Sequence, residues 1–251
     1  MLGGIAINNK RLLAANAENK VRLSILNKAY LKYLNNKYYI LFEKMKSCER
    51  RYYCNSLACA VCVNRIQKEI TYKYINYLGN DYIFVTLIFY RDKIPVIKLS
   101  KFNPARLKDK LRKKLKAIGF DKPIFGSLEI DLHLYKNKGD SYYLPHFHLL
   151  MPNEQLKFKK LRDYMKSNSN LQGRIGVKNR PMLVKRIDNL EGIIRYITKF
   201  MWCEIPWYLD NKGKLTHGSK RRISNNRLFA DSLIRLDKLK ISDLLFKCNF
   251  Q

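Results

Sequence analysis

The stretch IFGSLEIDLHLY, residues 124–135, alternates between apolar and polar side chains and constrains the fold more than any other segment. Successive side chains of a strand point to opposite faces, so the alternation predicts a strand with one apolar and one polar face. A polar turn around KNKGDS then leads into LPHFHLLM, residues 144–151, which predicts a β-hairpin. The apolar face carries Leu128, Ile130, Leu132 and Leu134, and the polar face carries Glu129, Asp131 and His133.

The second strand of this hairpin places His146 and His148 on one face, because residues i and i+2 of a strand point the same way. Their Cα atoms should lie about 7 Å apart, so both imidazoles can reach one metal ion. A carboxylate from the facing strand would complete a three-ligand site with open positions, as a catalytic metal requires. Histidine plus carboxylate suits Mn²⁺ or Mg²⁺. The alternative is a solvated polar face, but acidic residues opposite the histidines of a basic chain favour the metal site.

The segments around the hairpin predict the element order β-α-β-β-α-β followed by one more helix. A helix over 104–118 is indicated by Asn103 as N-cap, Pro104 at the first helical position and Gly119 as C-cap. This order predicts an α+β fold of the ferredoxin-like, split β-α-β kind, a central antiparallel sheet with helices on one face. The other expected elements are basic helical sequence over 10–46, helices over 63–77 and 154–167, strands over 81–90 and 182–187, and a helix opening at Asp188 or Asn189.

Four cysteines fall within fifteen residues, as Cys48-x5-Cys54-x4-Cys59-x2-Cys62 ahead of a predicted helix. Thiolates at this density suit a tetrahedral structural Zn²⁺ site, and the closing Cys-x2-Cys is a common half of such sites. The alternative is four unrelated buried thiols. Cys203 and Cys248 are expected to be ordinary core residues, and His217 to lie in a basic hairpin or loop.

The formal net charge of +30 points to a polyanionic partner, and nucleic acid is the first expectation. An AT-rich coding genome would also raise the lysine content, although it would not remove acidic residues. No run of about 18 apolar residues occurs, so no membrane span and no membrane partner are expected. The first twenty residues carry charges where a signal peptide would be apolar, which favours a cytoplasmic protein.

The segment NLEGIIRYITKFMW, residues 189–202, predicts a helix with Tyr196 and Lys199 as neighbours on one face. An adjacent ammonium and a nearby metal would favour the phenolate of Tyr196, an activated nucleophile for phosphoryl transfer. A tyrosine stem packed on the sheet is the structural alternative. The predicted buried stripe of this helix is Leu190, Ile193, Ile194, Ile197 and Met201.

Taken together, FVTL, SLEIDL with LPHFHLLM, and RYITK resemble the three motifs of the HUH endonucleases, in the right order. The segment CNSLACAVCVNR resembles the cysteine segment of replication initiators of rolling-circle plasmids. The resemblance covers roughly residues 45–203. It implies three parts of the chain. Residues 1–79 would form a basic helical segment with a four-cysteine zinc module, residues 80–204 an endonuclease core, and residues 205–251 a basic C-terminal extension of hairpin and helix.

The resemblance also implies roles for single residues. His146 and His148 would be metal ligands with Glu129 as the acidic third, while Asp131 and His133 are alternatives. Tyr196, assisted by Lys199, would attack a phosphodiester in single-stranded or hairpin origin DNA and leave a 5′-phosphotyrosyl link and a free 3′-OH. Host helicase and polymerase are the further expected partners. Residues expected to hold the DNA are Arg195, Lys136, Lys138, Lys220, Arg221 and Arg222.

One position departs from the family pattern. Similar initiators often carry a glutamate one turn before the tyrosine, thought to activate water in the terminating step, and here that position is Gly192. Glu191 lies five residues before Tyr196, about 140° round the helix. The alternatives to an initiator are an HUH-type transposase and a catalytically inactive, zinc-containing DNA-binding protein. RNA binding would rest on the ferredoxin-like sheet alone.

Overall fold

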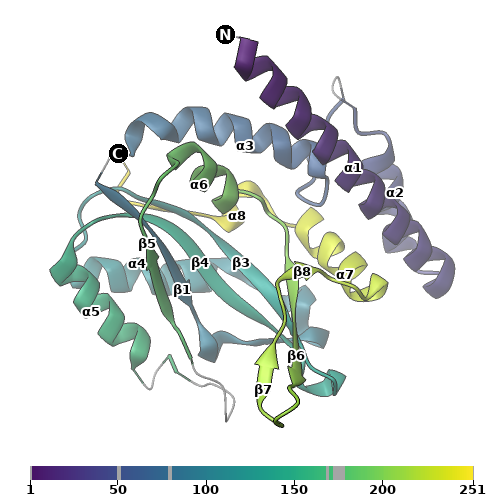
Figure 1. Ribbon diagram of the computed structural model, residues 1–251. Helices are drawn as coiled ribbons and strands as arrows, with labels where there is room; N and C mark the ends of the chain where they lie inside the picture. The colour runs from purple at the N-terminus through teal and green to yellow at the C-terminus, as the bar shows by residue number, and fades with distance from the viewer. Residues whose placement is uncertain (1, 50–51, 79–80, 168–169, 172–178, 251) are drawn as a thin grey trace.

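The computed structural model describes residues 2–49, 52–78, 81–167, 170–171 and 179–250, except for the side chains of residues 2–8 and 138. The helices are α1 (Leu2–Tyr33), α2 (Asn36–Lys46), α3 (Ala60–Tyr74), α4 (Pro104–Ile118), α5 (Gln155–Lys166), α6 (Leu190–Ile197), α7 (Asn226–Asp237) and α8 (Ile241–Leu244). The strands are β1 (Tyr82–Ile88), β2 (Ile94–Pro95), β3 (Ile124–Leu134), β4 (Tyr142–Pro152), β5 (Met182–Lys185), β6 (Cys203–Leu209), β7 (Leu215–His217), β8 (Arg221–Arg222) and β9 (Leu245–Cys248). The chain is therefore an α+β protein (Figure 1).

The main path of the sheet runs in the order β5-β1-β4-β3-β6-β7. Every neighbouring pair on the path from β5 to β3 is antiparallel, as the sequence predicted. The sheet as a whole is nevertheless mixed and not purely antiparallel, because β6 lies parallel to β3. The reason is the connection: β6 reaches the edge of β3 after the chain has crossed the sheet through α6, and not through a tight hairpin.

The β3–β4 hairpin has the register that the polar alternation predicted. Glu129 pairs directly with His146, and Ser127 pairs with His148. The turn between the strands contains a 3-10 helix over Lys138–Asp140. Since the side-chain period of a strand is two, this register puts the carboxylates of β3 and the histidines of β4 on one face.

Helices cover both faces of the sheet, so the expectation of helices on one face is wrong. Lys110 of α4 lies over the ring of Phe89, which packs against Phe147, and this contact puts α4 on the apolar face. On the polar face, the Ser127 hydroxyl donates to the backbone oxygen of Ile197 in α6. Figure 1 accordingly shows α4 behind the sheet and α6 in front of it.

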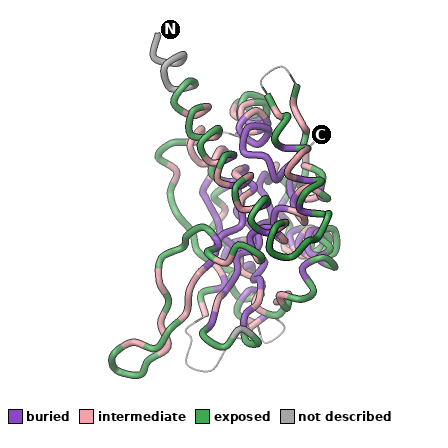
Figure 2. The backbone as a smooth tube through the Cα atoms, turned by 90° about the vertical axis from the view of Figure 1, so that its right-hand side faces the viewer, coloured by how far each residue is buried: buried purple, intermediate pink, exposed green. Residues whose placement is uncertain are grey.

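The buried residues run through the centre of the molecule, as the purple segments of Figure 2 show. The apolar face of α4 packs into this core: Leu107, Leu111 and Leu115 are at most 5% exposed, and Ile118 is half-buried. The predicted caps are present, with Asn103 accepting from Ala105 and Gly119 in the left-handed region at φ 94°. One face of β3 and β4 therefore supplies the main core, while the other face is left for polar groups.

Two predicted helices end earlier than their sequence patterns suggested. The basic helical region over 10–46 divides into α1 and α2 at Leu34, whose φ is +48°. The helix predicted over 189–202 ends at Ile197 with Thr198 as its C-cap, and Phe200, at a φ of +40°, lies in the turn that leads into β6. Lys199 and Met201 therefore lie beyond α6, and Met201 is not part of a helical stripe.

The terminal segments join the same core. Residues Lys37 and Lys44 of α2 pair with Asp231 and Asp237 of α7. Strand β9 pairs with β3, and β6 spans the boundary predicted between residues 204 and 205. In the part of the chain that the structure describes, no helix is both long and apolar enough to cross a membrane.

Candidate metal centre and groove

The polar face of the sheet brings together Glu129 of β3 with His146 and His148 of β4. All three side chains are buried, and their potential ligand atoms lie within 4.8 Å of one another. The Nε2 atoms of both histidines are 3.7 Å from Oε2 of Glu129. Ligand pairs on an octahedral ion at about 2.1 Å would be roughly 3.0 Å apart, so small side-chain movements would complete the site. This group can hold a metal ion.

Hydrogen bonds at the Nδ1 atoms of His146 and His148 orient both imidazoles. Nδ1 of His146 lies 3.2 Å from the backbone oxygen of Leu144, and it must carry the proton to donate there. This leaves the lone pair of Nε2 facing the carboxylate, which is the tautomer that a metal needs. Nδ1 of His148 bonds to the hydroxyl of Thr86 on β1, 3.0 Å away. Thr86 was not among the predicted site residues, although a threonine inside the apolar run IFVTLI was a usable signal.

The electrostatics of the group also fit a cation. Burial lowers the pKa of His148 to about 2, so this imidazole is neutral at pH 7. Burial opposes the ionisation of Glu129, but Lys199, His146, His148 and Lys220 together outweigh it and keep the pKa of the carboxyl well below its usual range. Within the described part of the chain, both Glu129 oxygens and Nε2 of His148 are buried without a hydrogen-bond partner. Buried atoms of this kind are available as ligands.

Two lysines compensate the buried carboxylates. Nζ of Lys199 lies 2.7 Å from Oε2 of Glu129. Lys220, which follows β7, approaches from the other side, and its Nζ lies 2.6 Å from Oδ2 of Asp131. Lys220 was predicted from the sequence to be a DNA-binding residue, whereas the structure puts its ammonium against the carboxylates.

Tyr196 of α6 lies beside this group and remains accessible, with 42% of its surface exposed. Its ring centroid is 5.1 Å from that of His148 and 5.9 Å from that of Phe84. Nζ of Lys199 lies 4.2 Å from the Tyr196 ring centroid, although Lys199 is outside the helix. The predicted neighbours are therefore close in space, because the chain turns back after α6.

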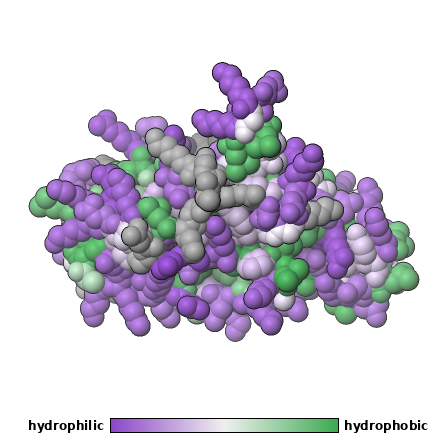
Figure 3. Space-filling view, turned by 90° about the horizontal axis from the view of Figure 1, so that it is seen from below, coloured by the Kyte–Doolittle hydropathy of each residue, from purple (hydrophilic) through white to green (hydrophobic). Residues whose placement is uncertain are grey.

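A groove of about 780 Å³ opens over the polar face, between β5 on one side and the β6–β7 hairpin on the other. His146, His148 and Tyr196 belong to its lining. Basic and aromatic side chains also line it, namely Arg180, Lys185, Lys214, Lys220, Tyr90, Tyr142 and Trp207. Figure 3, which looks from the end where this hairpin lies, shows a surface dominated by hydrophilic side chains.

The two alternative ligands predicted from the sequence have other partners. His133 accepts a hydrogen bond at Nδ1 from Nε1 of Trp207, 2.9 Å away, and stacks on Tyr142. Burial lowers the pKa of His133 to about 4. Asp131 lies closer, with Oδ2 at 3.6 Å from Nε2 of His146, but its other oxygen accepts the backbone N–H of Cys203.

The remaining predicted DNA-binding residues do not form one patch. Lys136 is exposed beside the β3–β4 turn, and the side chain of Lys138 lies outside the described residues. Arg221 pairs with the buried Glu204, and Arg222 pairs with Glu18 of α1. Arg195 and Arg11 both form ion pairs with Glu191. Glu191 is the carboxylate that could have taken the role of the glutamate that is absent at position 192, and these ion pairs occupy it. The sequence did not predict that Arg180, Lys185 and Lys214 line the groove, because their positions depend on the tertiary arrangement of β5 and β7.

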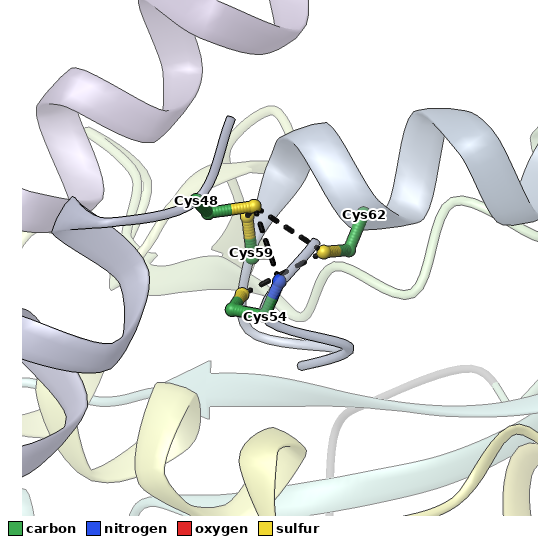
Figure 4. A group of neighbouring side chains, drawn as sticks. All are labelled: Cys48, Cys54, Cys59 and Cys62. Carbon is green, nitrogen blue, oxygen red and sulfur yellow. Dashed lines mark hydrogen bonds between the residues drawn. The ribbon is translucent and has the colours of Figure 1, made fainter. Parts of the chain in front are cut away.

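The four predicted cysteine ligands converge at the start of α3 (Figure 4). Sγ of Cys48 lies 3.5 Å from Sγ of Cys59 and of Cys62, and Cys54 lies 3.6 Å from Cys62. Sulfur atoms bound to one tetrahedral Zn²⁺ at about 2.3 Å would be about 3.8 Å apart, so the cluster has the dimensions of such a site. Hydrogen bonds from Cys54 and Cys59 lower the pKa of Cys62, which favours a thiolate. The cluster can hold a metal ion.

The cysteine cluster is connected to the groove through α3. Nε2 of Gln67 in α3 donates to the backbone oxygen of Arg195, 2.8 Å away, next to Tyr196. The N-terminal module therefore supports the helix that carries the tyrosine. Comparisons with protein-family models, curated proteins and solved structures give no match for this chain.

Proposed function

We propose that this protein is an HUH-type endonuclease that nicks single-stranded DNA by tyrosine transesterification and acts as a replication initiator of a rolling-circle replicon. The observation that carries the proposal is the accessible Tyr196 ring 5.1 Å from the ring of His148, beside the buried group of Glu129, His146 and His148. A nucleophile next to a potential divalent-metal site in an open groove is the arrangement that phosphoryl transfer requires.

The sheet supports the same proposal. The strands β5-β1-β4-β3 and the intervening helices α4 and α5 follow the order expected of a split β-α-β, ferredoxin-like arrangement. In the HUH resemblance, the histidine pair belongs on an inner strand of that arrangement, and β4 lies between β1 and β3. Strand order alone does not determine function, so the proposal rests on the site.

The proposed reaction exchanges one phosphodiester for another. The Tyr196 hydroxyl loses its proton and its oxygen attacks the phosphorus, while the bond from phosphorus to the 3′-oxygen breaks. The leaving oxygen takes up a proton and becomes the free 3′-OH, and the 5′-phosphate stays on the tyrosine. Lys199, with Nζ at 4.2 Å from the ring centroid, stabilises negative charge beside the phenolate.

Metal and DNA binding follow from the same residues. An Mn²⁺ or Mg²⁺ ion held by Glu129, His146 and His148 would supply a Lewis acid for the scissile phosphate. Arg180, Lys185 and Lys214 of the groove lining would neutralise backbone phosphates, and its aromatic rings offer surfaces for unpaired bases.

A transposase of the HUH type would use the same chemistry, and a catalytically inactive, zinc-containing DNA-binding protein would keep the groove without the reaction. A gene that lies between mobile-element ends would favour the transposase. The inactive alternative is disfavoured by the joint presence of the tyrosine and the three ligand candidates at one site.

The test is adduct formation on labelled single-stranded DNA from the protein's own replicon, with Mn²⁺, followed by denaturing electrophoresis. The wild-type chain should give a denaturation-resistant protein–DNA adduct, and Tyr196→Phe should give none while still binding DNA. Tyr208→Phe is the matched control, because Tyr208 is also exposed, at 52%, and lies on β6 outside the groove lining. An adduct that persists in Tyr196→Phe would refute the assignment.

The metal role is tested with His146→Ala combined with His148→Ala. Cleavage should lose its dependence on divalent ions and fall to background, since two of the three candidate ligands are removed. Cleavage at the wild-type rate in this variant would contradict the metal site, whatever the outcome for Tyr196.

A further inference from the structure

The candidate metal centre contains one more carboxylate than the three-residue ligand group. Asp131 is 4% exposed and Glu129 is 1% exposed, and both project from β3 onto the same face. Oδ2 of Asp131 lies 3.6 Å from Nε2 of His146, while Oε2 of Glu129 lies 3.7 Å from the same atom. Distance to the imidazole therefore does not decide which carboxylate binds the ion.

The two carboxylates differ in how many of their oxygen atoms have partners. Lys199 lies 2.7 Å from Oε2 of Glu129 and leaves Oε1 without a polar contact at this distance. Lys220 pairs with Asp131 at 2.6 Å and lies 3.8 Å from Glu129. The second Asp131 oxygen accepts the N–H of Cys203 at 3.1 Å. Both oxygens of Asp131 are thus engaged, whereas Glu129 is paired with Lys199 through Oε2 alone and its Oε1 lacks a hydrogen-bond partner among the described residues.

The structure anchors Lys220 in this position. The two residues that follow it form β8, which pairs with Cys203 and Glu204 of β6. The fully buried carboxylate of Glu204 accepts hydrogen bonds from Nε of Arg221 and from the backbone and hydroxyl of Ser224. About a third of the Lys220 side chain is exposed, at 31%, so the ammonium keeps part of its hydration.

From this arrangement we infer that Lys220 is a specificity-determining residue of the metal centre: its ammonium occupies Asp131 and restricts the protein ligands to Glu129, His146 and His148. This inference rests on the metal site of the proposed function and extends it. A catalytic ion needs positions that remain open for water and substrate oxygen, and a second carboxylate would fill one of them. Ligand charge also sets affinity, so two carboxylates would hold a hard cation more tightly and exchange it more slowly.

The experiment is a titration of the full-length protein with Mn²⁺, followed by calorimetry and by electron paramagnetic resonance of the free ion. Lys220→Met removes the competing ammonium, and the buried Asp131 carboxylate, which has lost its ion-pair partner, then turns to the ion. The Kd for Mn²⁺ should fall by about tenfold or more. Water-proton relaxation should show fewer water molecules on the bound ion, because Asp131 replaces one of them.

Matched variants separate this effect from a general change of charge. Lys214→Met removes the same charge from the same groove lining and should change the Kd by no more than about twofold, since exposed charges are screened. Asp131→Asn keeps the oxygen that accepts the Cys203 N–H and should bind Mn²⁺ within about threefold of wild type. Combined with Lys220→Met, Asp131→Asn should abolish most of the gain in affinity.

The outcomes separate the inference from the proposed function. If wild type binds Mn²⁺ and Lys220→Met binds it equally or less tightly, the role of Lys220 is refuted and the metal site stands. A gain that survives in the double variant refutes it as well, because Asp131 is then not the added ligand. Loss of binding in Asp131→Asn alone would make Asp131 a ligand of the wild-type site and overturn the inference. A wild-type chain that binds no Mn²⁺ overturns both the inference and the metal site.

Discussion

Acid should destabilise the folded protein through His133, a buried histidine outside the three-residue metal group. His133 is 8% exposed, and its Nδ1 accepts the hydrogen bond of the Trp207 indole. A protonated Nδ1 cannot accept that bond. Desolvation lowers the pKa of His133 from its ordinary value of 6.5 to about 4, although the charge of Asp131 opposes the shift.

The sign of the effect follows from proton binding in the two states. Between pH 6.5 and pH 4 the unfolded chain protonates His133 and the folded chain does not, so the free energy of unfolding decreases as the pH falls. With these two pKa values, the loss between pH 7.5 and pH 5 is about 2 kcal/mol. The contribution is fully present above pH 6.5 and is completely lost near pH 4.

The assay is urea unfolding at pH 7.5 and pH 5, followed by tryptophan fluorescence, for wild type and His133→Gln. The glutamine stays neutral and offers an oxygen to the Trp207 N–H, so the variant should lose about 2 kcal/mol less stability than wild type over this range. Some dependence on pH should remain in the variant, because burial also lowers the pKa of His148, to about 2. Equal pH dependence in the two proteins would refute the reasoning.

Three further predictions concern the supports of the site. Cys62→Ser should release one equivalent of zinc and lower the free energy of unfolding by at least about 3 kcal/mol, a Tm decrease of roughly 10 °C. Cys248→Ser is the control, because Cys248 lies outside the cluster and this variant should retain the metal. Metal analysis and thermal melts measure both effects, and full zinc content in Cys62→Ser would contradict the site. Gly126→Ala should destabilise the protein by about 3 kcal/mol and weaken Mn²⁺ binding, because the new Cβ would lie 2.2 Å from the backbone oxygen of His148. Gly139→Ala, at an exposed turn, is the control. An unchanged Tm for Gly126→Ala would show that the strands can separate freely. Glu204→Gln should cost about 1–2 kcal/mol in urea unfolding, since an amide cannot accept all the bonds of Arg221 and Ser224, and an unchanged unfolding midpoint would show that this carboxylate does not anchor the segment after Lys220.

The candidate site was predictable from the sequence as far as local periodicity reaches. A period of two placed Glu129 and Asp131 on one face of β3, and the pair His146 and His148 on one face of β4. The turn around residues 138–140 then brought these faces together in the predicted register. The cysteine spacing likewise predicted four thiols that the structure brings within ligand distance of one another.

The sequence could not predict contacts that depend on how distant elements pack. The parallel position of β6, the position of α6 on the polar face and the end of α6 at Ile197 are set by packing and by the positive φ of Phe200. These features decide that Lys199 reaches Glu129 and that Lys220 reaches Asp131.

By itself, the sequence determined which side chains the β3–β4 hairpin presents, because strand geometry fixes the alternation of faces whatever packs against them. Only the tertiary structure decided what each polar group does. Glu129 pairs with Lys199 through Oε2 and keeps Oε1 without a hydrogen bond, Asp131 is neutralised by a lysine from the C-terminal part of the chain, and His133 turns to Trp207. The physical reason is that a buried charge must find a partner, and in this protein the partners come from segments far apart in the sequence.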